Sequence, residues 1–329
     1  MKAIELKNIV KTYSTKKETI TAVDEVSFSV DEGEIFGLIG PDGAGKTSVF
    51  RILTTLLLAD SGKANVLGFD VVNNFKEIRD IIGYMPGRFS LYQDLTVEEN
   101  LEFFATIFNT TIEENYNLIA DIYKQLEPFK TRRAGKLSGG MKQKLALSCA
   151  LIHKPKILFL DEPTTGVDPV SRKELWEMLK RLKSQGITIL VSTPYMDEAK
   201  QCDRIALMQK GKILQIDTPQ NVVNEFGKNL YAVHSENMFP LLIDLREYPQ
   251  TESCFAFGDK HHLTLKDETF DISELEKHLI ARGHSNLTLK KIEPEIEDCF
   301  MQLMKAHPSE GVLRTTLPKG KGFKKLKTS

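Results

Sequence analysis

The chain has 329 residues, of which 41% are hydrophobic and 27% are charged, and its formal net charge is −1 at pH 7. This length accommodates one large domain and a small one, and the balanced charge does not suggest a general binder of nucleic acid or of membrane surfaces. No apolar stretch approaches the ~18–20 residues that a helix needs to cross a bilayer, and Lys2 and Glu5 argue against an N-terminal signal peptide.

The first informative segment is a short apolar run at residues 35–39, which predicts a buried strand. A glycine-rich run follows it and matches the pattern G-x-x-x-x-G-K-[S/T] with Gly40, Pro41, Asp42, Gly43, Ala44, Gly45, Lys46 and Thr47 in order. Apolar residues then recur at helical spacing between Ser48 and Leu58, so we expect a helix there. A strand, a glycine loop and the start of a helix let backbone N–H groups surround a phosphate.

Two side chains of this loop have expected roles of their own. Lys46 would reach the β- and γ-phosphates of a nucleotide, and the Thr47 hydroxyl would be a ligand of Mg²⁺. The sequence therefore predicts a site for ATP and Mg²⁺.

Residues 95–133 carry many apolar residues at helical spacing and few β-branched runs. Thr96 followed by Glu99 is the pattern of a capping box, which predicts that the first helix of this segment begins after Thr96. About ninety residues after the glycine loop comes Leu137-Ser138-Gly139-Gly140-Met141.

A continuous apolar run at residues 157–160 suits a central strand of a parallel sheet that helices cover on both faces. Asp161 and Glu162 follow this strand, at the edge where open α/β sheets bind ligands. We expect Asp161 to hold Mg²⁺ through water and Glu162 to polarise the attacking water. Downstream, Pro169 begins a helical pattern that ends at Gly186, and residues 187–191 form the next expected strand.

Together these motifs resemble those of the ATP-binding subunits of ABC transporters, more narrowly of exporters whose membrane-spanning partner is a separate polypeptide. The resemblance covers residues 1 to about 221, and it implies an α/β fold of the P-loop NTPase class with a helical subdomain. It also implies that Tyr13 stacks on adenine. The expected nucleotide-contacting residues are Tyr13, Gly40, Pro41, Asp42, Gly43, Ala44, Gly45, Lys46, Thr47, Ser48, Ser138, Gly139, Gly140 and Asp168.

The same resemblance implies a head-to-tail pair of nucleotide-binding subunits with two ATP molecules between them. Ser138, Gly139 and Gly140 would present helix N-terminal amides to the γ-phosphate of ATP bound by the other subunit. The segment from Gly166 to Pro169, which includes Asp168, resembles the loop that crosses between the subunits.

Two positions depart from the family pattern. Gly87 stands where the family has a glutamine that senses the metal, and Pro194 stands where a histidine contacts the γ-phosphate. Gly87 has no side chain, and proline supplies neither an imidazole nor an N–H. The family's roles therefore do not carry over to these positions, and the sequence predicts a weakened catalytic site.

In the family, the helical insertion, here residues 88–140, receives the coupling helix of the membrane subunit. Phe89, Leu91 and Tyr92 are the candidates for this contact, and the alternative is that they pack inward.

From Lys228 onward the pattern changes to β-α-β-β-α-β, the order of a ferredoxin-like module. Its expected elements are strands at 230–233, 253–257, 263–265 and 287–292, helices at 238–245 and from a capping box at Ser273 to Gly283, and a last helix from Pro294. His261 and His262 fit a hairpin position better than a metal site. A role in dimer contact or regulation and a plain structural role both remain open for this module.

We therefore expect a nucleotide-binding domain at 1–224, a C-terminal α+β extension at 228–306 and a basic, disordered tail at 307–329. The tail either stays solvated or is attracted to an anionic inner leaflet. The predicted function is an ATPase subunit that powers an exporter through a transmembrane permease, peripheral on the cytoplasmic face of the cell membrane. The alternatives are a poorly hydrolysing regulatory half of a heterodimer and a soluble ABC-type ATPase outside transport. The transported substrate is not readable from this chain.

Overall fold

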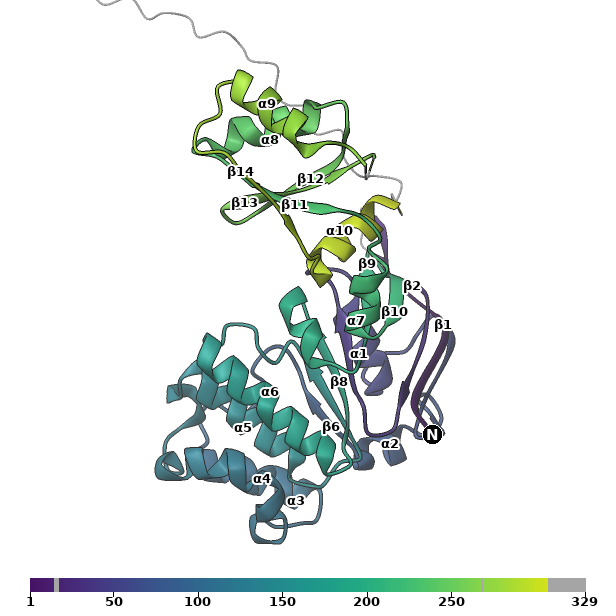
Figure 1. Ribbon diagram of the computed structural model, residues 1–329. Helices are drawn as coiled ribbons and strands as arrows, with labels where there is room; N and C mark the ends of the chain where they lie inside the picture. The colour runs from purple at the N-terminus through teal and green to yellow at the C-terminus, as the bar shows by residue number, and fades with distance from the viewer. Residues whose placement is uncertain (15–17, 268, 307–329) are drawn as a thin grey trace, which may run out of the picture.

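The computed structural model describes residues 1–14, 18–267 and 269–306, so the expectations for the basic tail lie outside the described residues. Within them the strands form three sheets, which Figure 1 shows from one side. The first is antiparallel in the order β2-β1-β4-β5, the second has the order β10-β9-β3-β8-β7-β6, and the third has the order β12-β13-β11-β14. The strands are β1 (Lys2–Ser14), β2 (Thr19–Asp31), β3 (Ile35–Ile39), β4 (Ser61–Val66), β5 (Phe69–Asp70), β6 (Ile82–Met85), β7 (Ile157–Asp161), β8 (Thr188–Thr193), β9 (Arg204–Gln209), β10 (Lys212–Asp217), β11 (Leu230–His234), β12 (Thr251–Phe257), β13 (Lys260–Leu265) and β14 (Thr288–Ile292).

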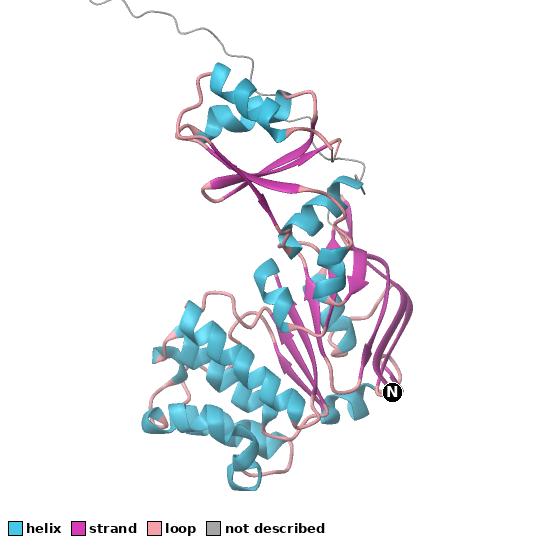
Figure 2. Cartoon of the chain, in the orientation of Figure 1, coloured by secondary structure: helices cyan, strands magenta, loops and turns pink. Residues whose placement is uncertain are grey.

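Helices cover the central sheet and the C-terminal sheet (Figure 2). The α-helices are α1 (Lys46–Leu53), α2 (Phe75–Ile81), α3 (Val97–Ile107), α4 (Ile112–Leu126), α5 (Gly139–Leu151), α6 (Pro169–Ser184), α7 (Pro219–Asn224), α8 (Met238–Glu247), α9 (Ile272–Ala281) and α10 (Ile296–Ala306). Short 3-10 helices are η1 (Glu127–Phe129), η2 (Ala134–Lys136) and η3 (Met196–Gln201).

The central sheet confirms the expected α/β class. β3 pairs in parallel with β8 and β9, and β7 pairs in parallel with β6 and β8. Every residue of β3, β7 and β8 is buried, as a strand covered on both faces requires. Because these strands run in the same direction, their carboxyl ends, and the loops that follow them, meet at one edge of the sheet.

Alternate residues of these strands enter two different apolar cores. Phe36 and Phe159 pack with α1 and the antiparallel sheet, and the rings of Phe50 and Phe159 meet edge to face at 6.1 Å. Leu158 and Leu160 face the other way, into a core shared with α3, α4, α5 and α6. The period of two along a strand therefore joins both layers to one sheet.

The helix after the glycine loop is shorter than its apolar spacing suggests. It begins at Lys46 and ends at Leu53, not at Leu58. Thr55 has a φ of 62°, which a right-handed helix does not accommodate, and Leu56 beyond it is exposed. The predicted end of this helix was wrong, because the apolar spacing continues past the residue at which the backbone turns out of the helix.

The helical segment was expected correctly. Thr96 and Glu99 form a complete capping box at the start of α3, and Thr111 and Glu114 form another at the start of α4. Of the three side chains expected on the surface, Tyr92 is 51% exposed, whereas Leu91 is 8% exposed and packs in the apolar core. Phe89 is partly buried against the same core. The surface expectation is therefore correct for Tyr92 and wrong for Leu91.

The C-terminal elements follow in the expected order β11-α8-β12-β13-α9-β14, and all neighbouring strands of their sheet are antiparallel. The capping box expected at Ser273 is wrong, because Asp271 caps α9 by accepting the backbone N–H of Ser273 at 3.0 Å. α10 begins at Ile296, not at Pro294. His261 and His262 lie on β13, in the hairpin where they were expected.

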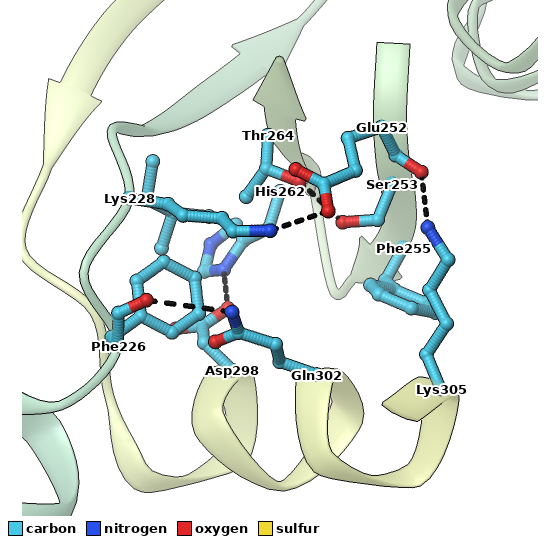
Figure 3. Close-up of a pocket in the computed structure, with 11 residues that line it drawn as sticks. Phe226, Lys228, Glu252, Ser253, Phe255, His262, Thr264, Asp298, Gln302 and Lys305 are labelled. Carbon is cyan, nitrogen blue, oxygen red and sulfur yellow. Dashed lines mark hydrogen bonds and ion pairs between the residues drawn. The ribbon is translucent and has the colours of Figure 1, made fainter. Parts of the chain in front are cut away.

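The last helix, α10, joins this module to the rest of the chain. Its residues Ile296 and Phe300 share the apolar core of Ala199 and Phe226. On its other side, Asp298 accepts a hydrogen bond from the His262 ring at 2.6 Å (Figure 3). α10 is therefore fixed both to η3, beside the central sheet, and to the C-terminal sheet.

The four cysteines, Cys149, Cys202, Cys254 and Cys299, are buried free thiols. Burial raises the pKa of Cys299 to about 12, so this thiol stays protonated at neutral pH.

Candidate active site

The glycine loop between β3 and α1 is shaped by backbone that approaches it closely. A Cβ at Gly40 would lie 2.2 Å from the Met208 carbonyl oxygen, and one at Gly45 would lie 2.1 Å from that of Ala22. Gly45 also has a φ of 108°, which side-chain-bearing residues rarely adopt. The loop lines a hollow of about 190 Å³ together with Ala22 and Glu162. The loop therefore lies over a hollow at the start of a helix, which is the geometry that a phosphate cradle requires.

Lys46 lies inside this loop and not on its surface. Its side chain is 3% exposed, and its ammonium group donates to the carbonyl oxygens of Gly40 at 2.8 Å and Pro41 at 3.1 Å. The same group lies 3.3 Å from the Glu162 carboxylate. The cation and the expected general base thus face the hollow as an ion pair.

The expected metal ligands lie together although 114 positions separate them in the chain. The Thr47 hydroxyl donates to Asp161 Oδ1 at 3.3 Å. Ser192, at the end of β8, donates to the same oxygen at 2.6 Å, and its hydroxyl oxygen accepts the backbone N–H of Glu162 at 3.0 Å. Hard oxygen donors of this kind fit Mg²⁺. Ser192 was not among the expected site residues, and its position directly after the apolar strand residues 187–191 is the signal by which it could have been found.

Glu162 follows β7 in a left-handed backbone conformation, with a φ of 52°. Such conformations in residues other than glycine are costly and cluster at functional sites. Here the conformation coincides with a carboxylate that lines the phosphate hollow. The local strain is consistent with a side chain that is positioned for chemistry.

Tyr13 lies at the mouth of the loop. Its hydroxyl and that of Ser48 are 3.2 Å apart, and the residue is 38% exposed. The ammonium group of Lys11 lies 5.9 Å from the ring centroid. An exposed aromatic ring beside the first turn of α1 is suitably placed for stacking on a base.

The remaining expected contacts form a separate surface. Ser138 caps α5 by accepting the N–H of Met141 at 3.3 Å. Asp168 caps α6 by accepting the N–H groups of Val170 and Ser171. These hydrogen bonds, chiefly the one from Ser171, lower the pKa of Asp168. Ser138 and Asp168 do not line the hollow, and α5 and α6 lie to the left of α1 in Figure 1.

Of the two departures from the family pattern, Gly87 lies beside Asp161 and Glu162, and Pro194 follows a residue that bonds the glycine loop. A Cβ at Gly87 would lie 3.0 Å from the carbonyl oxygen of Asp161. Pro194 follows Thr193, whose carbonyl oxygen accepts the N–H of Gly40 at 3.2 Å. Gly87 has no side chain and Pro194 has neither an imidazole nor an N–H, so neither can make the contacts expected of the family.

An apolar groove of about 430 Å³ lies between β6, α3 and α5, apart from the phosphate hollow. Its walls include Leu56, Tyr84, Leu91, Phe104 and Phe108. Burial, and then the nearby Asp161 carboxylate, raise the pKa of Tyr84 to about 12, so its hydroxyl stays protonated. This groove can take an apolar segment of a partner.

A smaller hollow between the C-terminal sheet and α10 contains paired charges (Figure 3). Lys228 pairs there with Glu252, and His262 pairs with Asp298. In the parts of the chain that the structure describes, no three His, Cys, Asp or Glu residues group as a metal site would require. The same parts contain no helix with the length and apolarity that would span a bilayer.

Comparison with known proteins gives matches over most of the chain. The family model described as ABC transporter matches residues 23–165. The Nod factor export ATP-binding protein I of Rhizobium sp. (strain N33) is 35% identical over 305 residues, which are 92% of this chain and 96% of that protein. The probable multidrug ABC transporter ATP-binding protein YbhF of Escherichia coli (strain K12) is 41% identical over 289 residues, or 86% of this chain and 49% of that protein. The chain thus spans about half the length of YbhF.

Solved structures of ATP-binding cassettes also match this chain. The ATP-binding cassette MJ0796, in a dimeric post-hydrolysis state with ADP and Pi, is 27% identical with a TM-score of 0.60. That match covers 65% of this chain and 98% of the cassette. An ATP-binding subunit of an ABC transporter, also 27% identical, has a TM-score of 0.62 over 68% of this chain and 93% of that one.

Proposed function

The chain belongs to the ABC transporter family of ATP-binding proteins, and on this basis we propose that it binds ATP with Mg²⁺ and hydrolyses it to power export through a separate membrane permease. The observation that carries the proposal is the meeting of Lys46, Thr47, Asp161 and Glu162 at one edge of the parallel sheet. The relative that has export in its name, the Nod factor export ATP-binding protein I, supports the direction of transport.

In the proposed reaction, the loop amides and the Lys46 ammonium group bind the β- and γ-phosphates, which requires Lys46 to exchange Glu162 for phosphate oxygens. Glu162 is then free to accept a proton from water as the water attacks the γ-phosphorus. A bond forms between phosphorus and the water oxygen while the bond to the β–γ bridging oxygen breaks, giving ADP and phosphate. Mg²⁺, held by Thr47 and, through water, by Asp161, would neutralise phosphate charge.

The test of this function is a measurement of steady-state ATP hydrolysis by the purified chain. It is made with the chain alone and with the membrane permease that co-purifies with it in detergent. We expect activity that EDTA abolishes and that the permease stimulates. Activity without any effect of a membrane partner would favour the soluble ATPase. ATP binding without hydrolysis in either condition would favour the regulatory half.

The active form is proposed to be a head-to-tail pair, either of two copies or of this chain with a second ATP-binding subunit. Ser138, Gly140 and Asp168 are exposed or half-buried outside the hollow of their own chain, which leaves them accessible to a second subunit. The dimeric state of the MJ0796 cassette supports this arrangement.

We propose that the apolar groove between β6, α3 and α5 receives the permease at the cytoplasmic face of the membrane. Leu56 lines this groove and is 57% exposed, so a charge there should disturb docking without disturbing the core. Leu56→Glu is expected to abolish the stimulation of ATP hydrolysis by the permease, and to leave ATP affinity unchanged. Permease-stimulated activity and co-elution in detergent are the measurements.

Ile280→Glu is the matched control, because Ile280 is also 57% exposed but lies on α9 of the C-terminal module. It should retain full stimulation. Equal loss in the two variants would contradict docking in the groove.

We also propose that Pro194 slows the chain's own turnover because the γ-phosphate lacks an imidazole contact. Pro194→His is expected to raise kcat for ATP hydrolysis about tenfold, which is within the range of rate effects of a single hydrogen bond to the transition state. Gly87→Gln should not raise it, since the new Cβ would lie 3.0 Å from the Asp161 carbonyl oxygen.

Pro194→Ala releases the backbone without adding an imidazole and is therefore the control. A rise in kcat in the alanine variant equal to that of the histidine variant would show that backbone freedom, and not a γ-phosphate contact, limits the rate.

A further inference from the structure

Glu198, in η3, is a buried carboxylate outside the phosphate hollow. Its side chain is 2% exposed, and it is absent from the residues that line the hollow. A charge that is removed from water is costly unless partners compensate it. The identity of those partners indicates what this carboxylate does.

One oxygen of Glu198 connects two segments of the catalytic site. Oε2 accepts the Thr193 hydroxyl at 2.6 Å and the Thr164 hydroxyl at 3.0 Å. Thr193 immediately precedes Pro194, and Thr164 lies in the turn directly after Glu162. Both hydroxyl groups are fully buried, and hydrogen bonds to a carboxylate are stronger than neutral ones. The turn that carries Glu162 is thereby tied to the segment that carries Pro194.

The other oxygen faces α6. Oε1 lies 3.5 Å from Nε of Arg172, and within the described residues neither atom has a hydrogen-bond partner. The backbone N–H of Arg172 donates to the carbonyl oxygen of Asp168 at 2.9 Å, one helical turn earlier in α6. The guanidinium carbon of Arg172 lies 4.2 Å from the centroid of the Tyr195 ring. Arg172 therefore connects Glu198 to the start of α6 and packs on the residue after Pro194.

We propose that Glu198 is a positioning residue for ATP hydrolysis, one that holds the Glu162 turn, the Thr193–Tyr195 segment and the start of α6 in a single arrangement. This inference rests on the proposed ATPase function. Pro194 supplies no imidazole, so the placement of its segment depends on the contacts of its neighbours. Glu198 accepts the Thr193 hydroxyl and faces Arg172, which packs on the Tyr195 ring. Glu198 acts on the orientation of Glu162 and Asp168, and does not touch the phosphates.

The test compares Glu198→Ala with Glu198→Gln. We expect kcat to fall at least about tenfold in the alanine variant while KM for ATP stays within about twofold, because only the transition state needs the arrangement. Glutamine keeps an oxygen that accepts the two hydroxyl groups but loses the charge opposite Arg172, so it should restore kcat in part. Glu177→Gln, which removes an exposed carboxylate of α6 that pairs with Lys173, is the control and should keep the wild-type kcat.

Thr164→Val provides a second route that does not depend on the stability of the alanine variant. It should lower kcat on its own, and in combination with Glu198→Gln the two losses should not add, because they remove the same link. Folded Glu198 and Thr164 variants with unchanged kcat, or with a raised KM alone, would overturn the proposal. An inactive wild-type chain would instead refute the proposed function on which it rests.

Discussion

Lys46→Ala is expected to abolish ATP binding. Lys46 is the cation inside the glycine loop, and its ammonium group already donates to two loop carbonyl oxygens and faces Glu162. Charge-assisted hydrogen bonds to phosphate contribute about 1.5–3 kcal/mol each, so losing two of them should weaken affinity at least about 100-fold. Direct titration with ATP and Mg²⁺, followed by calorimetry, is the measurement.

Lys212→Ala is the control, because the Lys212 side chain is 66% exposed and pairs with Asp24 on the surface. Its ATP affinity should match that of the wild type. The thermal midpoint of the Lys46 variant must also be measured, since the substitution leaves Glu162 without its cation. A folded Lys46→Ala protein with wild-type affinity would refute the assignment of the loop.

Glu162→Gln is expected to reduce ATP hydrolysis at least about 100-fold and to stabilise the ATP-bound pair of subunits. The amide cannot accept a proton from water, whereas the phosphate cradle is unchanged. The substitution also removes the negative charge that lies 3.3 Å from the Lys46 ammonium group. ATP affinity should therefore be equal to or higher than that of the wild type. Size-exclusion chromatography with ATP and Mg²⁺ should show a more persistent dimer.

Glu177→Gln, on the exposed side of α6, should leave both hydrolysis and the dimer unchanged. A Glu162→Gln protein that binds ATP and remains monomeric would contradict the head-to-tail arrangement.

In a heterodimer with a partner of standard motifs, Ser138→Arg should reduce turnover more than Glu162→Gln does. The reason is that Ser138 would complete the partner's site, whereas Glu162 serves the site weakened by Gly87 and Pro194.

Features of the fold that depend on near neighbours along the chain were predictable from the amino-acid sequence. The strand at Ile35–Ile39, the glycine loop and the capping box at Thr96 were all correctly expected. Each of these is a local match between residue type and backbone geometry. The order of the C-terminal strands and helices was also readable, because turn residues and apolar spacing mark each boundary.

Predictions from local patterns were wrong where a competing residue or a turn of the backbone determined where a helix ended or which residue capped it. The helix after the glycine loop ends at Leu53 because Thr55 turns left-handed, although the apolar spacing continues to Leu56. Asp271 caps α9 because it immediately precedes the helix, whereas Ser273 lies within the first turn and donates its backbone N–H to Asp271. Leu91 faces inward, since apolar residues with the same local spacing can fill a core or a surface.

Only the tertiary structure brought together residues that are distant in the chain. Ser192 bonds Asp161 across 31 positions, and Glu198 reaches Thr164 across 34. α10 lies on η3 although about a hundred residues separate them. The parallel sheet creates the first two of these contacts by placing the ends of β7 and β8 side by side at one edge. Burial then makes each polar group there require a partner, and periodicity along the chain carries no information about which partner it is.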